Sequence, residues 1–289
     1  MILPATFVGS FWFMIKYQIT NDYIEIFDSN EFNVKHILEC GQVFRYKVTD
    51  FGYTVYSGDQ KADIYCQKGS TKIFCKNKKY FVNYFDLDTN YDTIKSAISG
   101  DQFVDDAIKH GYGIRILRQN PVEMIVSFII SANNNIPRIK ASIEKICERF
   151  GEWDEDHYTF PTINKLSLAD AEFFKSSGCG YRAEYLVDTI KSLKDGFDVN
   201  AIYELHTEEA KKRLLTLKGI GPKVADCVLL FGFYKTDVFP TDTWIIHVYE
   251  SMFGLHGESV TKINRYFHNR FGKYSGYAQQ YLFYSQREK

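Results

Sequence analysis

The stretch that decides the fold covers residues 214–244 and reads LLTLKGIGPKVADCVLLFGFYKTDVFPTDTW. Within it, Gly219 and Gly221 permit a tight hairpin with exposed backbone amides, because glycine adopts backbone angles that other residues avoid. Pro222 suits the first position of a new helix, where its missing N–H would have no intrahelical partner. Exposed amides and a helix N-terminus together favour binding of a phosphate.

The residues on either side of this hairpin predict helices. We expect one helix to be capped by Thr207 and to end at residues 217–218, and a second, apolar helix to cover residues 224–231. The three parts form a helix-hairpin-helix. A Gly-x-Gly sequence alone is weak evidence, since an ordinary turn between core helices would also contain it, so the neighbouring side chains must decide.

Two side chains close to the hairpin can carry chemistry. Lys223 falls in the first turn of the second helix, where the positive helix end should lower the amine pKa, and a neutral amine is a nucleophile. Asp242 follows Phe-Pro-Thr at a predicted helix start, so we expect its carboxylate to cap that helix. The same carboxylate can stabilise positive charge that develops beside it.

The rest of the chain shows two patterns of apolar residues. Between residues 23 and 79, apolar and polar residues alternate and turn residues recur at hairpin intervals, which predicts an antiparallel meander. From about residue 92 the apolar period becomes helical. We therefore predict an α+β protein, in which an N-terminal antiparallel sheet domain (residues 1–115) packs on a larger all-helical domain (residues 116–289).

Composition narrows the classes of function. The chain has 289 residues, of which 45% are hydrophobic, 25% charged and 17% aromatic, so disorder, collagen and coiled coil are excluded. The formal net charge is −1, so a nucleic-acid site would be local and not a global basic field. The six cysteines contain no Cys-x-x-Cys pair, and we expect them to be reduced in a cytoplasmic protein.

The sequence contains no apolar run of about 18 residues, so we expect no membrane span. Its apolar start, MILPATFVGSFWFM, resembles the apolar region of a signal peptide. A signal peptide has a basic residue before that region, whereas here the first basic residue, Lys16, comes after it. A dispensable extension before Met14 is the other reading of this segment.

Six blocks of sequence, in chain order, resemble those of the 8-oxoguanine DNA glycosylases, a branch of the helix-hairpin-helix superfamily with a Gly/Pro-rich loop and an aspartate. They are CGQVFR at 40–45, ILRQNP at 116–121, SANNNIPR at 131–138, GYRA at 180–183, the hairpin KGIGPK with FPTD at 218–223 and 239–242, and GYAQ with LF at 276–279 and 282–283. Six ordered blocks are far more specific than any one of them.

The resemblance implies an enzyme that removes 8-oxoguanine from duplex DNA. Lys223 would attack C1′ of a flipped-out nucleotide, expel the base and form a Schiff base, after which elimination nicks the strand on the 3′ side. Asp242 would stabilise positive charge on the sugar. The chain would thus be a bifunctional DNA glycosylase and AP lyase of base excision repair, with no cofactor and no metal.

The resemblance also implies which residues bind the lesion. The carbonyl of Gly41 would accept a hydrogen bond from N7–H of 8-oxoguanine, which guanine lacks, a contact worth about 1–3 kcal/mol. Gln279 would bind the Watson–Crick edge, and Phe283 and Cys227 would sandwich the ring. For Phe283 and Cys227 taken alone, ordinary core packing is the alternative.

Further residues are implied to hold the DNA opposite the lesion. Asn133, Arg138 and Arg182 would bond to the opposite cytosine, and Tyr181 would wedge into the base stack. For the run of three asparagines that begins at Asn133, a polar loop between helices is the alternative.

The DNA backbone would be held at the hairpin. The amides at Gly219 and Gly221 offer a phosphate site, and Trp244 falls where we associate the family with a histidine that contacts a phosphate. The indole N–H of Trp244 can still donate a hydrogen bond. The expected partner is therefore double-stranded DNA containing 8-oxoguanine, and we expect a monomer that binds no membrane.

Two other readings remain. Alkylbase-removing relatives lack the catalytic lysine, and the thymine-glycol and adenine-mismatch branches usually carry a four-cysteine iron–sulfur cluster after the motif, whereas this chain has no cysteine after Cys227. A non-catalytic helix-hairpin-helix DNA-binding module would require neither Lys223 nor Asp242.

Overall fold

The computed structural model describes residues 15–27 and 30–288 of the chain. The two interpretations of the apolar start, signal peptide and dispensable extension, concern residues outside this range. Within it, one sheet contains the strands β1(Tyr17–Ile19), β2(Tyr23–Phe27), β3(Tyr46–Thr49), β4(Gly52–Ser57), β5(Gln60–Gln67) and β6(Ser70–Cys75), and a separate ribbon contains β7(Trp153–Asp154) and β8(His157–Tyr158).

The main sheet is antiparallel and has the order β1-β2-β6-β5-β4-β3. Strands β3 to β6 follow one another as a meander, as the alternating sequence predicts. Val55 pairs with Ala62, and Ile64 pairs with Ile73. All four side chains are fully buried, because alternate residues of a strand point to the same face and that face forms the N-terminal core.

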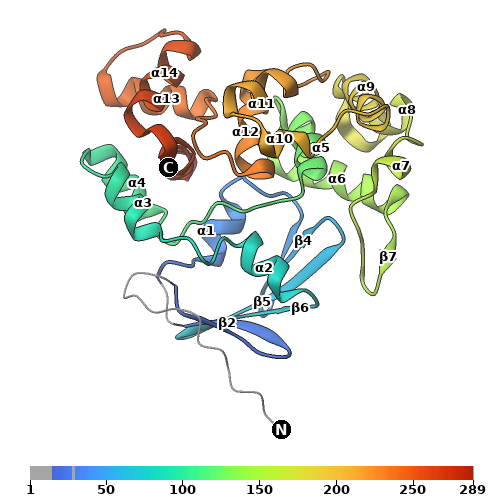
Figure 1. Ribbon diagram of the computed structural model, residues 1–289, viewed down its shortest axis with the longest axis horizontal. Helices are drawn as coiled ribbons and strands as arrows, with labels where there is room; N and C mark the ends of the chain where they lie inside the picture. The colour runs from blue at the N-terminus through green and yellow to red at the C-terminus, as the bar shows by residue number, and fades with distance from the viewer. Residues whose placement is uncertain (1–14, 28–29, 289) are drawn as a thin grey trace.

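Helices make up most of the remaining structure (Figure 1). They are α1(Val34–Glu39), α2(Lys78–Tyr84), α3(Tyr91–Ile98), α4(Gln102–His110), α5(Pro121–Ser131), α6(Ile136–Phe150), α7(Ile163–Leu166), α8(Ala171–Phe174), η1(Lys175–Cys179), α9(Arg182–Lys194), α10(Ala201–Glu204), α11(Thr207–Leu214), α12(Pro222–Phe233), α13(Thr243–Phe253), α14(Val260–Phe271), η2(Gly272–Tyr274) and α15(Ser275–Arg287). The predicted α+β class, an antiparallel sheet followed by a mostly helical part, is confirmed.

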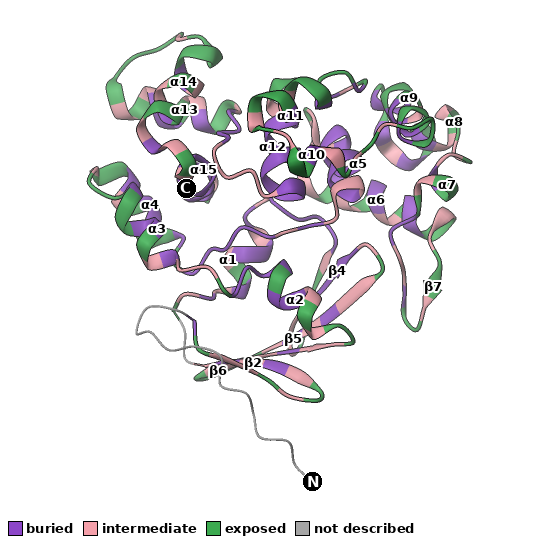
Figure 2. Cartoon of the chain, in the orientation of Figure 1, coloured by how far each residue is buried: buried purple, intermediate pink, exposed green. Residues whose placement is uncertain are grey.

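Helices α5 and α12 pack against each other at the centre of the helical part. Figure 2 shows both of them almost entirely buried, whereas α11, which precedes α12, is largely exposed. A helix that is apolar on all sides must be surrounded by protein. The hairpin therefore projects from a rigid core helix, which fixes the position of the residues at its N-terminus.

The N-terminal and C-terminal halves share one further core. Helix α4 packs against α15, and both contribute to a cluster that also contains residues of α13 and α14. The end of the chain thus packs against a helix from its N-terminal half. The predicted domain boundary at residues 115/116 stays a prediction.

Two details of the first hairpin helix differ from the prediction. Helix α11 ends at Leu214, before residues 217–218, because the following residues form tight turns in which Leu217 N–H donates to the Leu214 carbonyl. Thr207 is not a capping residue: His206 precedes the helix, and the Thr207 hydroxyl donates to Asp237 at 2.8 Å. The second helix is confirmed, and it runs on to Phe233.

All six cysteines are free, as expected from their spacing. Across residues 15–27 and 30–288, the structure contains no helix that is both long and apolar enough to cross a lipid bilayer.

Candidate active site

The hairpin rests directly on α9. Gly219 has a φ of +77°, and a Cβ there would lie 2.7 Å from the Cβ of Tyr185, so no other residue fits. The hydroxyl of Thr189 donates to the Lys218 carbonyl at 2.7 Å. Gly221 is the capping residue of α12 and is exposed, with nothing within 4 Å of its Cβ position. The start of α12 is therefore open to solvent.

Lys223 lies in the first turn of α12 and is half-buried. Its Nζ lies 5.6 Å from the centroid of the Phe128 ring. Cys227 follows one turn later on the same helix, is 3% exposed, and acts on the pKa of Lys223. The structure thus places the two residues predicted to attack the sugar and to stack on the base next to each other.

Asp242 is the capping residue of α13. Its Oδ1 accepts from the Ile245 N–H at 3.1 Å, as the sequence predicts. Its charge also acts on Lys223, although no ion pair of 4.0 Å or less joins Lys223 to a carboxylate within the described residues. The Asp242 carboxylate is therefore near enough to Lys223 to act on its pKa without forming an ion pair with it.

The direction of the Lys223 pKa corrects the sequence-based expectation. Burial lowers the pKa of Lys223, but the neighbouring Cys227 side chain and the negative charge of Asp242 outweigh this effect, and the net pKa is raised above the ordinary value. Burial raises the pKa of the Cys227 thiol to about 11, so this thiol is uncharged at neutral pH. The Asp242 carboxylate is therefore the charge that keeps the amine protonated in the DNA-free protein, against the helix end.

The turn around Gly41 follows α1, a helix that the strand pattern did not predict. Gly41 has a φ of +83°. Neighbouring carbonyls accept hydrogen bonds from long side chains: Glu39 from Arg287, Cys40 from Gln280 at 2.7 Å and Gln42 from Gln119 at 2.7 Å. Among the described residues, no group donates to the carbonyl of Gly41. That acceptor is left for a partner from outside the chain.

Phe283 and Gln279 come from α15, and Phe283 contacts this turn. A Cβ on Gly41 would lie 3.1 Å from Phe283 Cε1, so the ring lies against the glycine. Gln279 is one turn earlier and 5% exposed, and its Oε1 has no hydrogen-bond partner within the described chain. A buried acceptor without a partner costs about 1–3 kcal/mol, which a ligand that donates to it would recover.

An aromatic pair connects the hairpin to the Gly41 turn. The Phe128 ring, next to Lys223 Nζ, also meets the Phe44 ring edge-on, with 5.5 Å between centroids. Phe44 lies three residues after Gly41. Phe128 thus links the Lys223 amine to the segment that carries Gly41, although these parts of the chain are far apart in the sequence.

The residues predicted to hold the opposite strand lie next to the hairpin. Tyr185, which supports Gly219, packs edge-on against Tyr181 at 6.1 Å, and the Tyr181 hydroxyl donates to the Ala132 carbonyl at 3.5 Å. Tyr181 is 57% exposed, and Asn133 and Arg138 are exposed as well. Hairpin, Tyr181 and asparagine loop form one continuous surface.

Arg182 has a structural task that the sequence did not indicate. It is 6% exposed, and its guanidinium donates to the carbonyls of Ala132, Asn133 and Cys179. Arg182 thus fixes the loop that presents Asn133. Its predicted bond to the opposite cytosine stays a prediction.

Trp244 lies in the first turn of α13 and is 39% exposed. Its ring lies 6.3 Å from that of His247. An exposed indole at this helix start can donate to DNA, and its phosphate contact also stays a prediction.

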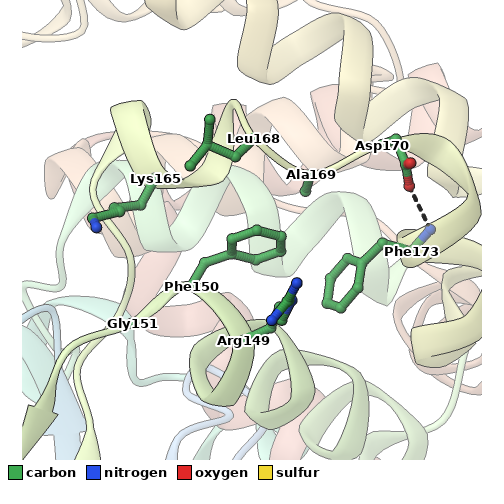
Figure 3. A pocket seen from close by; sticks show the side chains of 8 residues that line it. All are labelled: Arg149, Phe150, Gly151, Lys165, Leu168, Ala169, Asp170 and Phe173. Carbon is green, nitrogen blue, oxygen red and sulfur yellow. Dashed lines mark hydrogen bonds between the residues drawn. The ribbon is translucent and has the colours of Figure 1, made fainter.

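A separate cavity of about 430 Å³ lies between α6, α7 and α8 (Figure 3). It is lined by the side chains of Arg149, Phe150, Lys165 and Phe173 among others, and its acid, Asp170, accepts from the Phe173 N–H at 2.8 Å. None of the predicted site residues lines this cavity, so it does not bear on the chemistry of Lys223.

Sequence reasoning missed Phe128 and Arg287. Phe128 reads as one more apolar residue of a core helix, and nothing in the sequence distinguishes it. Arg287 had a signal: it follows Phe283 by four residues and Gln279 by eight, so a helix would place all three on one face.

We expect Gly41→Ala to lower release of the damaged base by about tenfold or more, while cleavage of a preformed abasic site is kept. The new Cβ would press on Phe283 at 3.1 Å and strain a positive φ. Base release and abasic-site cleavage are measured on matched duplexes. Gly69→Ala is the control, because Gly69 has a φ of +85° but nothing within 4 Å of its Cβ position. Equal loss in both variants would mean that backbone strain alone acts.

Two family models cover almost the whole described chain. Residues 25–125 match the model described as 8-oxoguanine DNA glycosylase, N-terminal domain. Residues 126–273 match that of the HhH-GPD superfamily base excision DNA repair protein.

Individual proteins agree with these models. The chain is 36% identical to the 8-oxoguanine glycosylase/lyase of Clostridium acetobutylicum, solved in complex with dsDNA containing cytosine opposite 8-oxoG, with a TM-score of 0.89 over 95% of this chain and 98% of that one. It is 34% identical to N-glycosylase/DNA lyase OGG1 of Arabidopsis thaliana over 61% of this chain, and 28% identical to the N-glycosylase/DNA lyase of Saccharomyces cerevisiae over 76%. The matched part spans 52% of the plant protein and 68% of the yeast protein.

Proposed function

Because the chain belongs to the HhH-GPD superfamily of base excision DNA repair proteins, in its 8-oxoguanine DNA glycosylase branch, we propose that it excises 8-oxoguanine from duplex DNA and nicks the strand at the resulting site. The observation that carries the proposal is the amine of Lys223 at the open end of α12, under the influence of the Asp242 charge. The relatives named above share these activities by name.

Lys223 supplies the nucleophile. In the DNA-free protein its amine is protonated, so it must lose a proton before it attacks. Entry of the nucleotide displaces water from the site, and the added desolvation lowers the amine pKa. The amine lone pair then bonds to C1′ while the C1′–N9 pair leaves with the base. The nitrogen loses a proton and the C1′–O4′ bond breaks, with its electron pair and a proton going to O4′, so that C1′ and Nζ form a Schiff base. Loss of a proton from C2′ then expels the 3′ phosphate with the electron pair of its bond to C3′.

Asp242 stabilises the positive charge that develops on the sugar. The bond between C1′ and the base weakens before the new bond is complete, so positive charge develops on the sugar. A carboxylate fixed by its hydrogen bond to the Ile245 N–H stabilises that charge without reorganisation. The same hydrogen bond caps α13, so one side chain serves the fold and the reaction.

Recognition of the lesion uses groups that the protein leaves unpaired. The Gly41 carbonyl accepts from N7–H of 8-oxoguanine and repels the bare N7 of guanine. Gln279 binds the Watson–Crick edge, and Phe283 and Cys227 enclose the ring. The contact with Gln279 also removes the cost of an acceptor that is buried without a partner in the described part of the DNA-free protein.

The opposite strand is held by the exposed surface next to the hairpin. Tyr181 fills the gap left by the flipped nucleotide, and Asn133 and Arg138 bond to the cytosine, with Arg182 fixing the loop. All these residues come from one chain, and we propose that the enzyme acts as a monomer. We also propose that it acts on chromosomal DNA in the cytoplasm.

The test is incision of end-labelled duplexes. We expect the protein to cut a strand with 8-oxoguanine opposite cytosine, to leave the matching guanine duplex intact, and to cut a preformed abasic site. Cleavage of the abasic duplex alone would contradict the substrate. No cleavage of either duplex would contradict the enzyme and favour a DNA-binding module.

A further inference from the structure

Three side chains of α15 form a stripe along the site. Gln279, Phe283 and Arg287 are spaced by four residues, so successive members lie about 6 Å apart along the same face of the helix. Phe283 lies in the middle, with Gln279 at one end and Arg287 at the other. A purine stacked on Phe283 therefore has one edge near Gln279 and its opposite edge near Arg287.

Arg287 is held beside Gly41. Its Nη1 would lie 3.0 Å from a Cβ on Gly41, and its guanidinium carbon lies 5.6 Å from the centroid of the Phe283 ring. Its Nη2 donates to the Glu39 carbonyl and forms an ion pair with Glu288 at 3.1 Å. These contacts fix the guanidinium plane against the turn that carries the Gly41 carbonyl.

One nitrogen of this guanidinium is unused. Nη1 is buried and has no hydrogen-bond partner among the residues that the structure describes. Burying a charged N–H donor without a hydrogen-bond partner costs free energy. Nη1 carries two N–H groups, and both can only donate. The Gly41 carbonyl and Gln279 Oε1 are acceptors without partners, so the site leaves both donors and acceptors free for a ligand.

The chemistry of 8-oxoguanine matches this arrangement. When its Watson–Crick edge faces Gln279, its imidazole edge faces Gly41 and Arg287. That edge carries N7–H, a donor, directly beside the C8 oxygen, an acceptor. The Gly41 carbonyl can accept the hydrogen bond from N7–H, and the C8 oxygen then requires a donor from the protein.

We propose, on the basis of the function proposed above, that Arg287 is a specificity-determining residue, and that its Nη1 donates a hydrogen bond to the C8 oxygen of 8-oxoguanine, an atom that guanine lacks. The two atoms that distinguish the lesion are thus bound by two neighbouring groups of the protein.

The contact also assists bond cleavage. When the C1′–N9 bond breaks, its electron pair stays on the base and delocalises from N9 through C8 onto the C8 oxygen. A guanidinium that already donates to this oxygen stabilises the developing negative charge, and no proton is transferred. Arg287 therefore affects the rate of base release as well as binding.

Arg287→Met tests this assignment, because methionine keeps length and apolar contacts but removes the donors. We expect excision of 8-oxoguanine to fall by about 10- to 100-fold, while cleavage of a preformed abasic site stays within about twofold, since that reaction has no base. Glu288→Gln is the control: it removes the ion pair at 3.1 Å but keeps the guanidinium, and excision should be unchanged. Unchanged excision in Arg287→Met would overturn the proposal.

A second readout separates the contact from support of the Gly41 turn. The Lys223→Gln variant is used here because we expect it to bind lesion DNA without cleaving it. Isotope-edited infrared spectra of this complex report the C8 carbonyl stretch of the bound base. We expect this band to shift to lower frequency with Arg287 and to lose the shift with Arg287→Met. The same band in both proteins would mean that Arg287 acts only through the Glu39 carbonyl, and would overturn the proposal. No excision by the unmodified protein would instead contradict the proposed function itself.

Discussion

Lys223→Gln is expected to abolish covalent trapping of the protein on 8-oxoguanine DNA by borohydride and to lower strand cleavage by about three orders of magnitude or more. Glutamine has nearly the length of lysine but its amide nitrogen does not attack C1′. It also removes the positive charge next to Phe128 and Asp242. Binding of the uncleaved duplex should persist, because the hairpin amides and the exposed surface around Tyr181 are unchanged.

Lys212→Gln is the matched control for this change. Lys212 is an exposed residue of α11, a short distance before the hairpin in the sequence, and the substitution removes the same charge. Trapping and cleavage by this control should equal those of the unmodified protein. If Lys223→Gln protein were trapped as efficiently as the control, Lys223 would have no part in the mechanism.

Asp242→Asn is expected to lower excision by about 10²- to 10³-fold with little change in the free energy of unfolding. Asparagine caps a helix about as well as aspartate, so the hydrogen bond to the Ile245 N–H at 3.1 Å survives while the charge is lost. The rate is measured under single-turnover conditions, and stability by urea unfolding.

Asp242→Ala separates the two roles of this side chain. It removes charge and cap together, so it should lose the same activity and about 1 kcal/mol of stability in addition. Full activity in Asp242→Asn would contradict a role of the carboxylate charge. A loss of activity seen only in Asp242→Ala would mean that Asp242 acts by placing α13.

The helix-hairpin-helix could be predicted from local chemistry alone. Gly219, Pro222 and Asp242 each have a conformational reason to stand where they do, and the structure gives each the backbone role expected. The antiparallel meander could also be predicted, because alternating apolar residues indicate a sheet with one buried face.

The part of the site that we propose binds the base could not be predicted from local chemistry. The Glu39 carbonyl and the Arg287 guanidinium are 248 positions apart, and no periodicity relates them. Gly41 and Phe283 entered the prediction through a family resemblance, and Arg287 was missed because the resembling blocks end before it. Only the packing of α15 against the end of α1 brings these groups together.

The direction of the Lys223 pKa shift could not be predicted from the local sequence either. The helix end near Lys223 argues for a lowered amine pKa, but Asp242 and Cys227 act on the same nitrogen and reverse the direction. Asp242 reaches the site from the start of another helix. The sum of such opposing effects depends on three-dimensional arrangement, which a sequence pattern does not give.

The most direct test is to find the atom of the protein that carries the DNA. The borohydride-reduced complex with an 8-oxoguanine duplex is digested with protease and nuclease, and the modified peptide is sequenced by mass spectrometry. The sugar remnant is predicted on Nζ of Lys223 alone. A remnant on another amine, such as that of Lys218 in the hairpin, would contradict the assignment of Lys223 as the nucleophile.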